Sequence, residues 1–258
     1  MPLRRALGLA IPLACAALFV RLGVWQLSRL AERRAFNATL AVRLSAPPVD
    51  VAALPADTAQ GHYRRVTAAG VLRYDREVVL AGRARQGAPG VHLLTPLDVP
   101  GRGVSDAVVM VNRGWVYSAD AATVEPARWR ERDTVRVEGY VETYRVDSRK
   151  QTAVSSQPSA RSRERSASGA PLRTIRGLDR EAIERAVGSS VAPYVLVQTG
   201  DTAVRDSVPV RLGLPSLDEG PHRNYAIQWF AFAVIAVVGG VALFKRQTAD
   251  SRRLTADG

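Results

Sequence analysis

The sequence predicts an α+β membrane protein in which two transmembrane helices flank an outer, antiparallel β-rich domain. Two observations lead to this fold class: long apolar runs near both ends of the 258-residue chain, and short β-rich segments separated by tight turns. Several short strands at close spacing are typical of an antiparallel sheet or a small barrel. The expected parts are a cytoplasmic tail (1–5), a first transmembrane helix (6–27), an extracytoplasmic domain (28–221), a second transmembrane helix with the residues that lead into it (222–244) and a second cytoplasmic tail (245–258).

The first apolar run is long enough for a membrane span only when its continuation is included. Ala6 to Val20 provide fifteen uncharged residues, a length that is also typical of the core of a secretory signal peptide. The run resumes after Arg21, whose long side chain can reach the interface, and Trp25 then lies at interfacial depth. We therefore favour a retained helix over a cleaved signal peptide.

The second apolar run is a membrane-span candidate with an unusual beginning. The twenty residues from Tyr225 to Phe244 carry no charge, and a helix of this length covers about 30 Å, the thickness of the bilayer hydrocarbon. Polar and aromatic side chains crowd the first two turns: His222, Asn224, Tyr225, Gln228 and Trp229. An ordinary anchor with an interfacial aromatic belt would also explain that beginning.

Basic residues in both tails place the two termini on one side of the membrane. Arg4 and Arg5 precede the first run and Lys245 and Arg246 follow the second, so the positive-inside rule predicts two cytoplasmic termini. Four arginines between positions 21 and 34 weaken this bias, but a loop of about two hundred residues can translocate regardless of its charge. The sequence thus predicts a multi-pass protein of the bacterial cytoplasmic (inner) membrane with a periplasmic central domain.

The central domain begins with a helical extension and continues with strands. Residues 28–46 extend the first helix beyond the membrane, until Pro47 and Pro48 end it. Short β-rich runs, and strict alternation of apolar and polar residues in the last of them, then predict four or five strands. Their ranges are His62–Leu72, Glu77–Ala81, Gly90–Val99, Ala107–Tyr117 and Thr134–Val146, with Trp129 on a short helix or turn. Segment 147–171 is polar and poor in apolar residues, which predicts a disordered loop.

Beyond this loop the pattern predicts a short strand, a helix and a last strand. Thr174–Leu178 is the short strand, and Asp179 and Gly188 are a typical N-cap and C-terminal stop for the helix between them. Tyr194–Thr199 is the last strand. An extended, proline-bounded segment, Val208–Leu214, leads to the second span.

Composition and motifs argue against nucleic-acid binding and against catalysis. The net charge of +12 comes almost wholly from arginine, without a basic stripe of interleaved aromatic residues. The single cysteine, Cys15, supports neither a disulfide framework nor a cysteine-based metal site. The sequence contains no nucleophile elbow, phosphate-binding loop or metalloprotease motif, and His62 and His92 fall in predicted strands. We therefore predict that the protein is not an enzyme.

His222 is the histidine whose surroundings suggest chemistry. It precedes Tyr225 by about one helical turn and Trp229 by two, so the three side chains are expected near one helix face. An imidazole beside an apolar, aromatic-lined cleft is what an axial heme ligand requires, and Arg21 and Arg223 at the same interface could pair with heme propionates. A lone interfacial histidine without a special bond is the alternative.

Two glutamines are expected at similar depth in the membrane. Gln26 ends the first span beside Trp25, and Gln228 begins the second span beside Trp229. The two amides could bond each other or a shared ligand, or each could be solvated at its own interface.

Four segments, in this order, resemble the Surfeit locus protein one family of cytochrome c oxidase assembly factors. They are Leu22–Leu27 with Arg29, Gly90–Leu97, Val111–Val116 and His222–Phe230. Each motif is weak alone, but the combination and its placement at the two span edges are specific and cover nearly the whole chain. Tyr117 stands where the family pattern has a proline, and segment 147–171 looks like an insertion.

The resemblance implies a non-catalytic membrane assembly factor for heme–copper cytochrome c oxidase, which binds heme a transiently and aids its insertion into the large oxidase subunit. A membrane scaffold that contacts oxidase subunits without a cofactor is the alternative. The implied partners are the large subunit, the lipid bilayer and the heme a synthesis machinery. The family's candidate iron ligand corresponds to His222. The residues expected to line its site are Arg21, Trp25, Gln26, Tyr225, Gln228 and Trp229, whereas Asn112–Trp115 are expected to form a turn or a surface for the oxidase.

Overall fold

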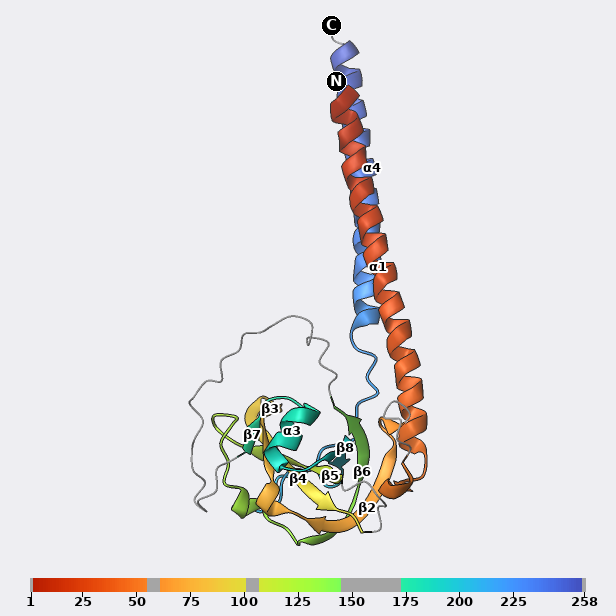
Figure 1. Cartoon of the computed structure of the whole chain (residues 1–258). Helices are drawn as coiled ribbons and strands as arrows, with labels where there is room; N and C mark the ends of the chain where they lie inside the picture. The colour runs from red at the N-terminus through yellow and green to blue at the C-terminus, as the bar shows by residue number, and fades with distance from the viewer. Residues whose placement is uncertain (1, 55–60, 101–106, 145–172, 257–258) are drawn as a thin grey trace. The chain divides into compact units, whose positions relative to one another are not determined.

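A computed structural model of the chain describes residues 2–54, 61–100, 107–144 and 173–256, and the predicted disordered loop lies outside them. The chain separates into two compact units. Unit 1 comprises residues 1–41 and 216–258 and holds two long helices (Figure 1). Unit 2 comprises residues 42–215 and holds the sheet.

The helices of unit 1 lie side by side and run antiparallel. α1 spans Pro2–Ser45, with its last turn in unit 2, and α4 spans His222–Ala256. Close packing depends on small residues at the interface. A Cβ atom at Gly23 would lie 2.7 Å from the Phe230 ring, and Gly240 lies against Pro12.

Both helices are long and apolar enough to cross a membrane. The apolar windows lie within Ala10–Ser45 and His222–Ala249, where the mean hydropathy is 1.6 and 2.2. Only 11% of each window is buried, far less than in a core helix of a soluble protein. Such extensive apolar exposure indicates insertion into a membrane.

Unit 2 is built on one eight-stranded sheet that is mainly antiparallel. Its strands are β1 (Val49–Asp50), β2 (Arg65–Leu72), β3 (Val78–Arg85), β4 (Ala88–Asp98), β5 (Val108–Tyr117), β6 (Thr134–Thr143), β7 (Arg173–Ile175) and β8 (Val191–Gln198). The strand order is β1-β2-β6-β8-β5-β4-β3-β7, and β2 also pairs with β4. That extra pairing closes β2, β6, β8, β5 and β4 into a five-stranded barrel. The predicted α+β class and barrel-like domain are therefore confirmed.

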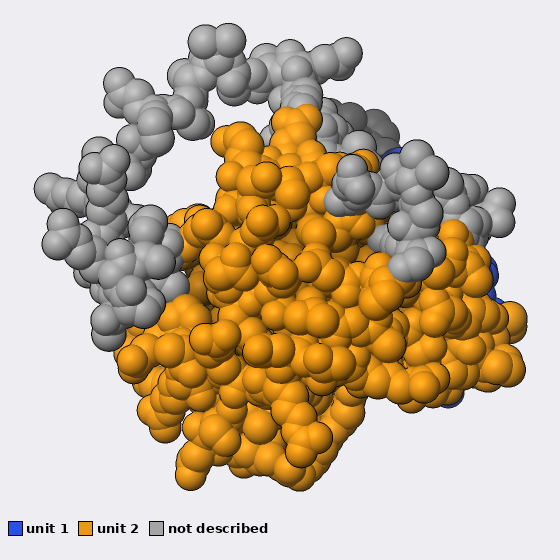
Figure 2. Space-filling model, turned by 60° about the horizontal axis from the view of Figure 1, so that its bottom comes forward, with its two compact units in different colours: residues 1–41, 216–258 blue, residues 42–215 orange. Residues whose placement is uncertain are grey.

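The barrel strands bury side chains on both faces. In β8, Tyr194 and Leu196 belong to the barrel interior, whereas Val191 and Val195 face a second apolar cluster beneath α3 (Arg180–Val187). Alternate residues of a strand point to opposite faces, so a strand covered on both sides is apolar along nearly its whole length. On the face shown in Figure 2, unit 2 is one continuous body.

The ends of α3 are as the sequence predicts. The Asp179 side chain accepts a hydrogen bond from the Ala182 amide at 2.8 Å, and Gly188 follows the helix with φ of 76°. The prediction that His62 lies in a strand is wrong, because Tyr63 has φ of 62° and holds His62 in a turn before β2. The described part of unit 2 also holds three 3₁₀ helices, η1 (Val51–Ala53), η2 (Tyr74–Arg76) and η3 (Pro126–Trp129).

Candidate functional site

Two polar side chains from the ends of the apolar runs meet within unit 1. His222 Nδ1 lies 2.8 Å from Gln26 Oε1. An amide oxygen can only accept a hydrogen bond, so Nδ1 must be the donor. In the neutral ring, Nε2 then keeps its lone pair, and it has no hydrogen-bond partner among the residues that the structure describes. Gln26, at 9% exposed, thus orients the imidazole and leaves one nitrogen able to bind a metal.

An aromatic cluster lies two helical turns from this polar pair. Phe19 precedes Gln26 by seven residues and Trp229 follows His222 by seven, which corresponds to about 10 Å along each helix. The Phe19 and Trp229 rings are stacked, with centroids 5.8 Å apart and planes inclined by 25°. Phe232 lies 5.9 and 6.0 Å from these two rings. The helix pair therefore offers an imidazole followed by an apolar, aromatic surface.

Side chains of α1 also hold the segment that leads into α4. Arg34 makes a two-point contact with Glu219, at 2.8 and 2.9 Å. The hydrogen bond from Arg34 lowers the pKa of the Glu219 carboxyl. Asn37, which is 8% exposed, donates to the carbonyls of Leu217 and Asp218 at 2.6 and 3.2 Å. These contacts fix the approach of the chain to His222.

The structure brings three of the seven predicted site residues to the helix pair and leaves four exposed. The three are His222, Gln26 and Trp229. The exposed residues are Arg21, Trp25, Tyr225 and Gln228. Gln26 bonds His222 rather than the second glutamine.

Sequence reasoning missed Phe19, Phe232 and Asn37. For Phe19 a signal existed, because a spacing of seven residues from Gln26 places both on one face of a helix. No local signal marks Asn37, since its partners are carbonyl groups 180 and 181 residues away in the chain.

The Asn112–Trp115 motif forms neither a turn nor an exposed surface. It lies within β5, and its asparagine, arginine and tryptophan are 1%, 0% and 5% exposed. The register between β4 and β5 shifts at this point, and Arg113 is the extra residue between the paired Asn112 and Gly114. Such a β-bulge redirects a side chain, and here it turns Arg113 into the domain.

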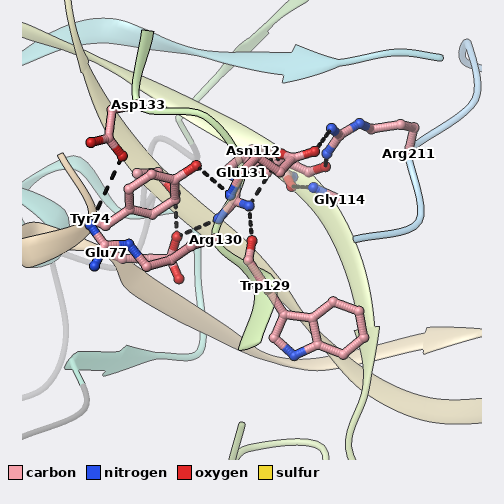
Figure 3. A network of polar contacts seen from close by, with 11 residues as sticks. Tyr74, Glu77, Asn112, Gly114, Trp129, Arg130, Glu131, Asp133 and Arg211 are labelled. Atoms are coloured by element: carbon pink, nitrogen blue, oxygen red, sulfur yellow. Dashed lines mark hydrogen bonds and ion pairs between the residues drawn. The ribbon is translucent and has the colours of Figure 1, made fainter. Parts of the chain in front are cut away.

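Arg113 stands at the centre of a buried charge network that also contains Glu77, Glu131 and Arg211 (Figure 3). The Arg113 guanidinium donates to Glu77 Oε2 at 2.8 Å, to Glu131 Oε2 at 3.2 Å and to the carbonyl of Trp129. Arg211 donates to the Arg113 carbonyl at 2.6 Å and to Glu131 Oε1. Two cations balance two carboxylates, so the network is self-neutralising and holds strands and loops together.

Comparison with known sequences assigns the chain to a family. The profile of the SURF1 family matches residues 13–234, which include Phe19, Gln26, His222, Trp229 and all of unit 2. The chain belongs to the SURF1 family. SURF1 proteins are known generally as oxidase assembly factors, so the resemblance seen in the sequence motifs is confirmed.

Several SURF1-like proteins are similar to the chain. One from Monosiga brevicollis is 34% identical over 130 residues, which are 46% of this chain and 49% of that protein, so the match spans about half of the relative. An uncharacterized SURF1-like protein of Mycobacterium bovis is 26% identical over 238 residues, covering 91% of this chain and 80% of the relative. A SURF1-like protein of Rickettsia felis is 23% identical over 231 residues, covering 86% and 89%.

Proposed function

We propose that this SURF1 protein binds heme a at the Gln26–His222 pair and aids its insertion into the large subunit of a heme–copper cytochrome c oxidase. The hydrogen bond from His222 Nδ1 to Gln26 Oε1 carries the proposal, because it leaves Nε2 to ligate the iron. A partner on the far ring nitrogen fixes the ring orientation and increases the basicity of the ligating nitrogen.

The surroundings of the pair fit an apolar macrocycle. Phe19, Trp229 and Phe232 provide aromatic surface on the same helix pair. Arg21 is exposed on α1 near Gln26, where its charge suits a propionate group. When bound, heme would supply the iron, His222 Nε2 would be its ligand, and Gln26 would orient the imidazole. A single imidazole ligand also suits cargo that must later be released.

The function needs a defined topology. We place α1 and α4 across the bacterial cytoplasmic membrane, with both termini in the cytoplasm and unit 2 in the periplasm. The apolar windows support the spans, and the basic tails support the orientation. A reporter fused after Gly258 is expected to be active only in the cytoplasm, and activity in the periplasm would refute this orientation.

The partners follow from this role. The heme a synthesis machinery supplies the cargo, the large oxidase subunit receives it, and the SURF1 protein carries out no covalent chemistry. The alternative is a scaffold that contacts oxidase subunits and binds no cofactor.

An absorption spectrum separates the two functions. The full chain is purified in detergent from cells that make heme a, and we expect a Soret band that His222→Ala abolishes. His62→Ala is the matched control in unit 2 and should retain the band. Gln26→Ala should weaken heme affinity by about 10–100-fold, the usual effect of removing the partner of a ligating histidine. Wild-type protein without heme, but still copurifying with the large oxidase subunit, would favour the scaffold.

A further inference from the structure

A row of aromatic side chains runs along α4 from His222 into the apolar window. Tyr225, Trp229 and Phe232 follow His222 by three, seven and ten positions, which is the spacing of one helix face. At 1.5 Å per residue, Phe232 lies about 15 Å from His222 along the helix axis. The row therefore begins beside the candidate iron ligand and ends well inside the apolar window, which runs from His222 to Ala249.

Phe19 of α1 joins the deep end of this row. Its ring centroid lies 5.8 Å from that of Trp229 and 5.9 Å from that of Phe232. These contacts connect the two long helices of unit 1, which lie side by side (Figure 1). Phe232 is 47% exposed, and Phe19 and Trp229 are partly exposed. The three rings, which we call the aromatic cluster, thus form a fixed surface that can still contact a further apolar group.

The chemistry of heme a matches the distance between His222 and this cluster. A heme carries its two propionates at one edge of the ring, and heme a carries a long isoprenoid chain near the opposite edge. Ionised propionates are costly in hydrocarbon, so they stay at the membrane interface. With the iron on His222 Nε2, the opposite edge and its chain would then extend towards the aromatic cluster. Phe232 lies farther from His222 than the ring itself extends, so the chain is the part of the ligand that reaches it.

We propose that the aromatic cluster binds the isoprenoid chain of heme a and thereby selects farnesylated hemes over heme b. This inference rests on the proposed function, because His222 must first hold the ring. Association within lipid depends on close packing, and rigid aromatic rings provide a large contact area. A chain that is tethered to a bound ring also competes well with separate lipid acyl chains, because its contact with the cluster is intramolecular.

Three hemes separate the contribution of the chain from that of the ring. Heme b lacks the isoprenoid chain, heme o carries it, and heme a carries both the chain and a formyl group. The full-length protein in lipid nanodiscs is titrated with each heme, and binding is followed by the Soret band. Only the signal that His222→Ala abolishes counts as specific. We expect heme o and heme a to bind at least about tenfold more tightly than heme b, a factor that corresponds to 1.4 kcal/mol.

Substitutions in the aromatic cluster should affect the farnesylated hemes alone. Phe19→Leu and Phe232→Leu should each weaken heme o binding about twofold to tenfold, the range that aromatic contact energies set. Heme b binding should stay unchanged in both variants, which also shows that the helix pair is intact and His222 accessible. Phe244→Leu is the matched control, because it makes the same change near the far end of the apolar window and should alter neither affinity.

The possible outcomes distinguish this inference from the proposed function. Equal affinities for heme o and heme b would overturn the inference and leave heme binding at His222 standing, with lipid acyl chains covering the rings. Variants that weaken both hemes alike would also overturn it, because the rings would then contact the macrocycle. Absence of specific binding for all three hemes would refute the proposed function and this inference together.

Discussion

Replacing Arg113 by methionine tests the charge network of unit 2, because it removes the central cation and keeps a long side chain. The Glu77 side chain is 4% exposed, and its Oε2 would keep the Thr95 hydroxyl but lose the guanidinium. Its Oε1 has no hydrogen-bond partner to compensate. Glu131 would still hold Arg211, whereas Glu77 would lose its ion-pair partner and keep only the longer-range influence of the Arg130 charge.

The expected loss is large on the scale of domain stability. Removing one partner of a buried ion pair costs about 3–5 kcal/mol, whereas a domain is stable by about 5–15 kcal/mol in total. For a unit of this size, each kcal/mol lowers the unfolding midpoint by about 2–4 °C. We therefore expect Arg113→Met to lower the midpoint by about 6–20 °C.

Thermal unfolding of the full chain in detergent, followed by tryptophan fluorescence, measures this loss, since Trp115 and Trp129 lie in unit 2. The control is Arg205→Met, which removes an exposed ion pair with Asp201 and should change the midpoint little. Adding Glu77→Gln to Arg113→Met should recover part of the loss, because the orphaned charge is gone. The reasoning fails if Arg113→Met is no worse than the control, or if the double variant recovers nothing.

Three further predictions concern other parts of the molecule. Gly139→Ala should lower the unfolding midpoint, because the added Cβ would collide with the Val197 carbonyl where β6 pairs with β8. Gly213→Ala is the control, since open space surrounds that position, and it should leave the midpoint unchanged. Similar midpoints for the two variants would contradict the prediction. His92 should titrate by NMR with a midpoint near pH 4, because burial favours its neutral ring. The stability that this neutral ring contributes is fully present above pH 6.5 and should be lost as the pH falls towards 4. A titration midpoint near pH 6.5 would contradict the prediction. Asn37→Ala should reduce heme occupancy, measured from the Soret band, because it removes the hydrogen bonds that hold residues 217–218. The unfolding midpoint of unit 2 should not change. Full heme occupancy in the variant would show that these contacts do not position His222.

Local patterns predicted the elements well. The charge-free runs identified both long helices, alternation identified the strands, and cap residues placed both ends of α3. These features depend on neighbours within a few residues, which a single sequence displays directly. The β-bulge at Arg113 was missed, because a register shift depends on how β5 pairs with β4 and leaves no local pattern.

The candidate site was harder to predict because it joins residues 196 positions apart. A membrane helix that contacts lipid on one side and another helix on the other is apolar on both faces. Its sequence therefore does not indicate which face is turned towards the other helix. Trp25 and Gln26 illustrate this. The sequence made both of these neighbours candidates to line the site, but only Gln26 is buried. His222 was identified because a histidine beside an apolar run is chemically unusual whichever way it points.

The position of β8 in the barrel has a consequence for biosynthesis. β8 lies between β6 and β5, yet it follows both in the chain, so a nascent chain that ends before residue 191 exposes two unpaired strand edges. Arg211 arrives later still and supplies the last positive charge that Glu131 needs. The sheet therefore stays open and its charge network stays incomplete until synthesis has almost reached α4. Completion of unit 2 and synthesis of His222 are then nearly simultaneous, so a folded unit 2 would rarely exist without the helix that carries His222.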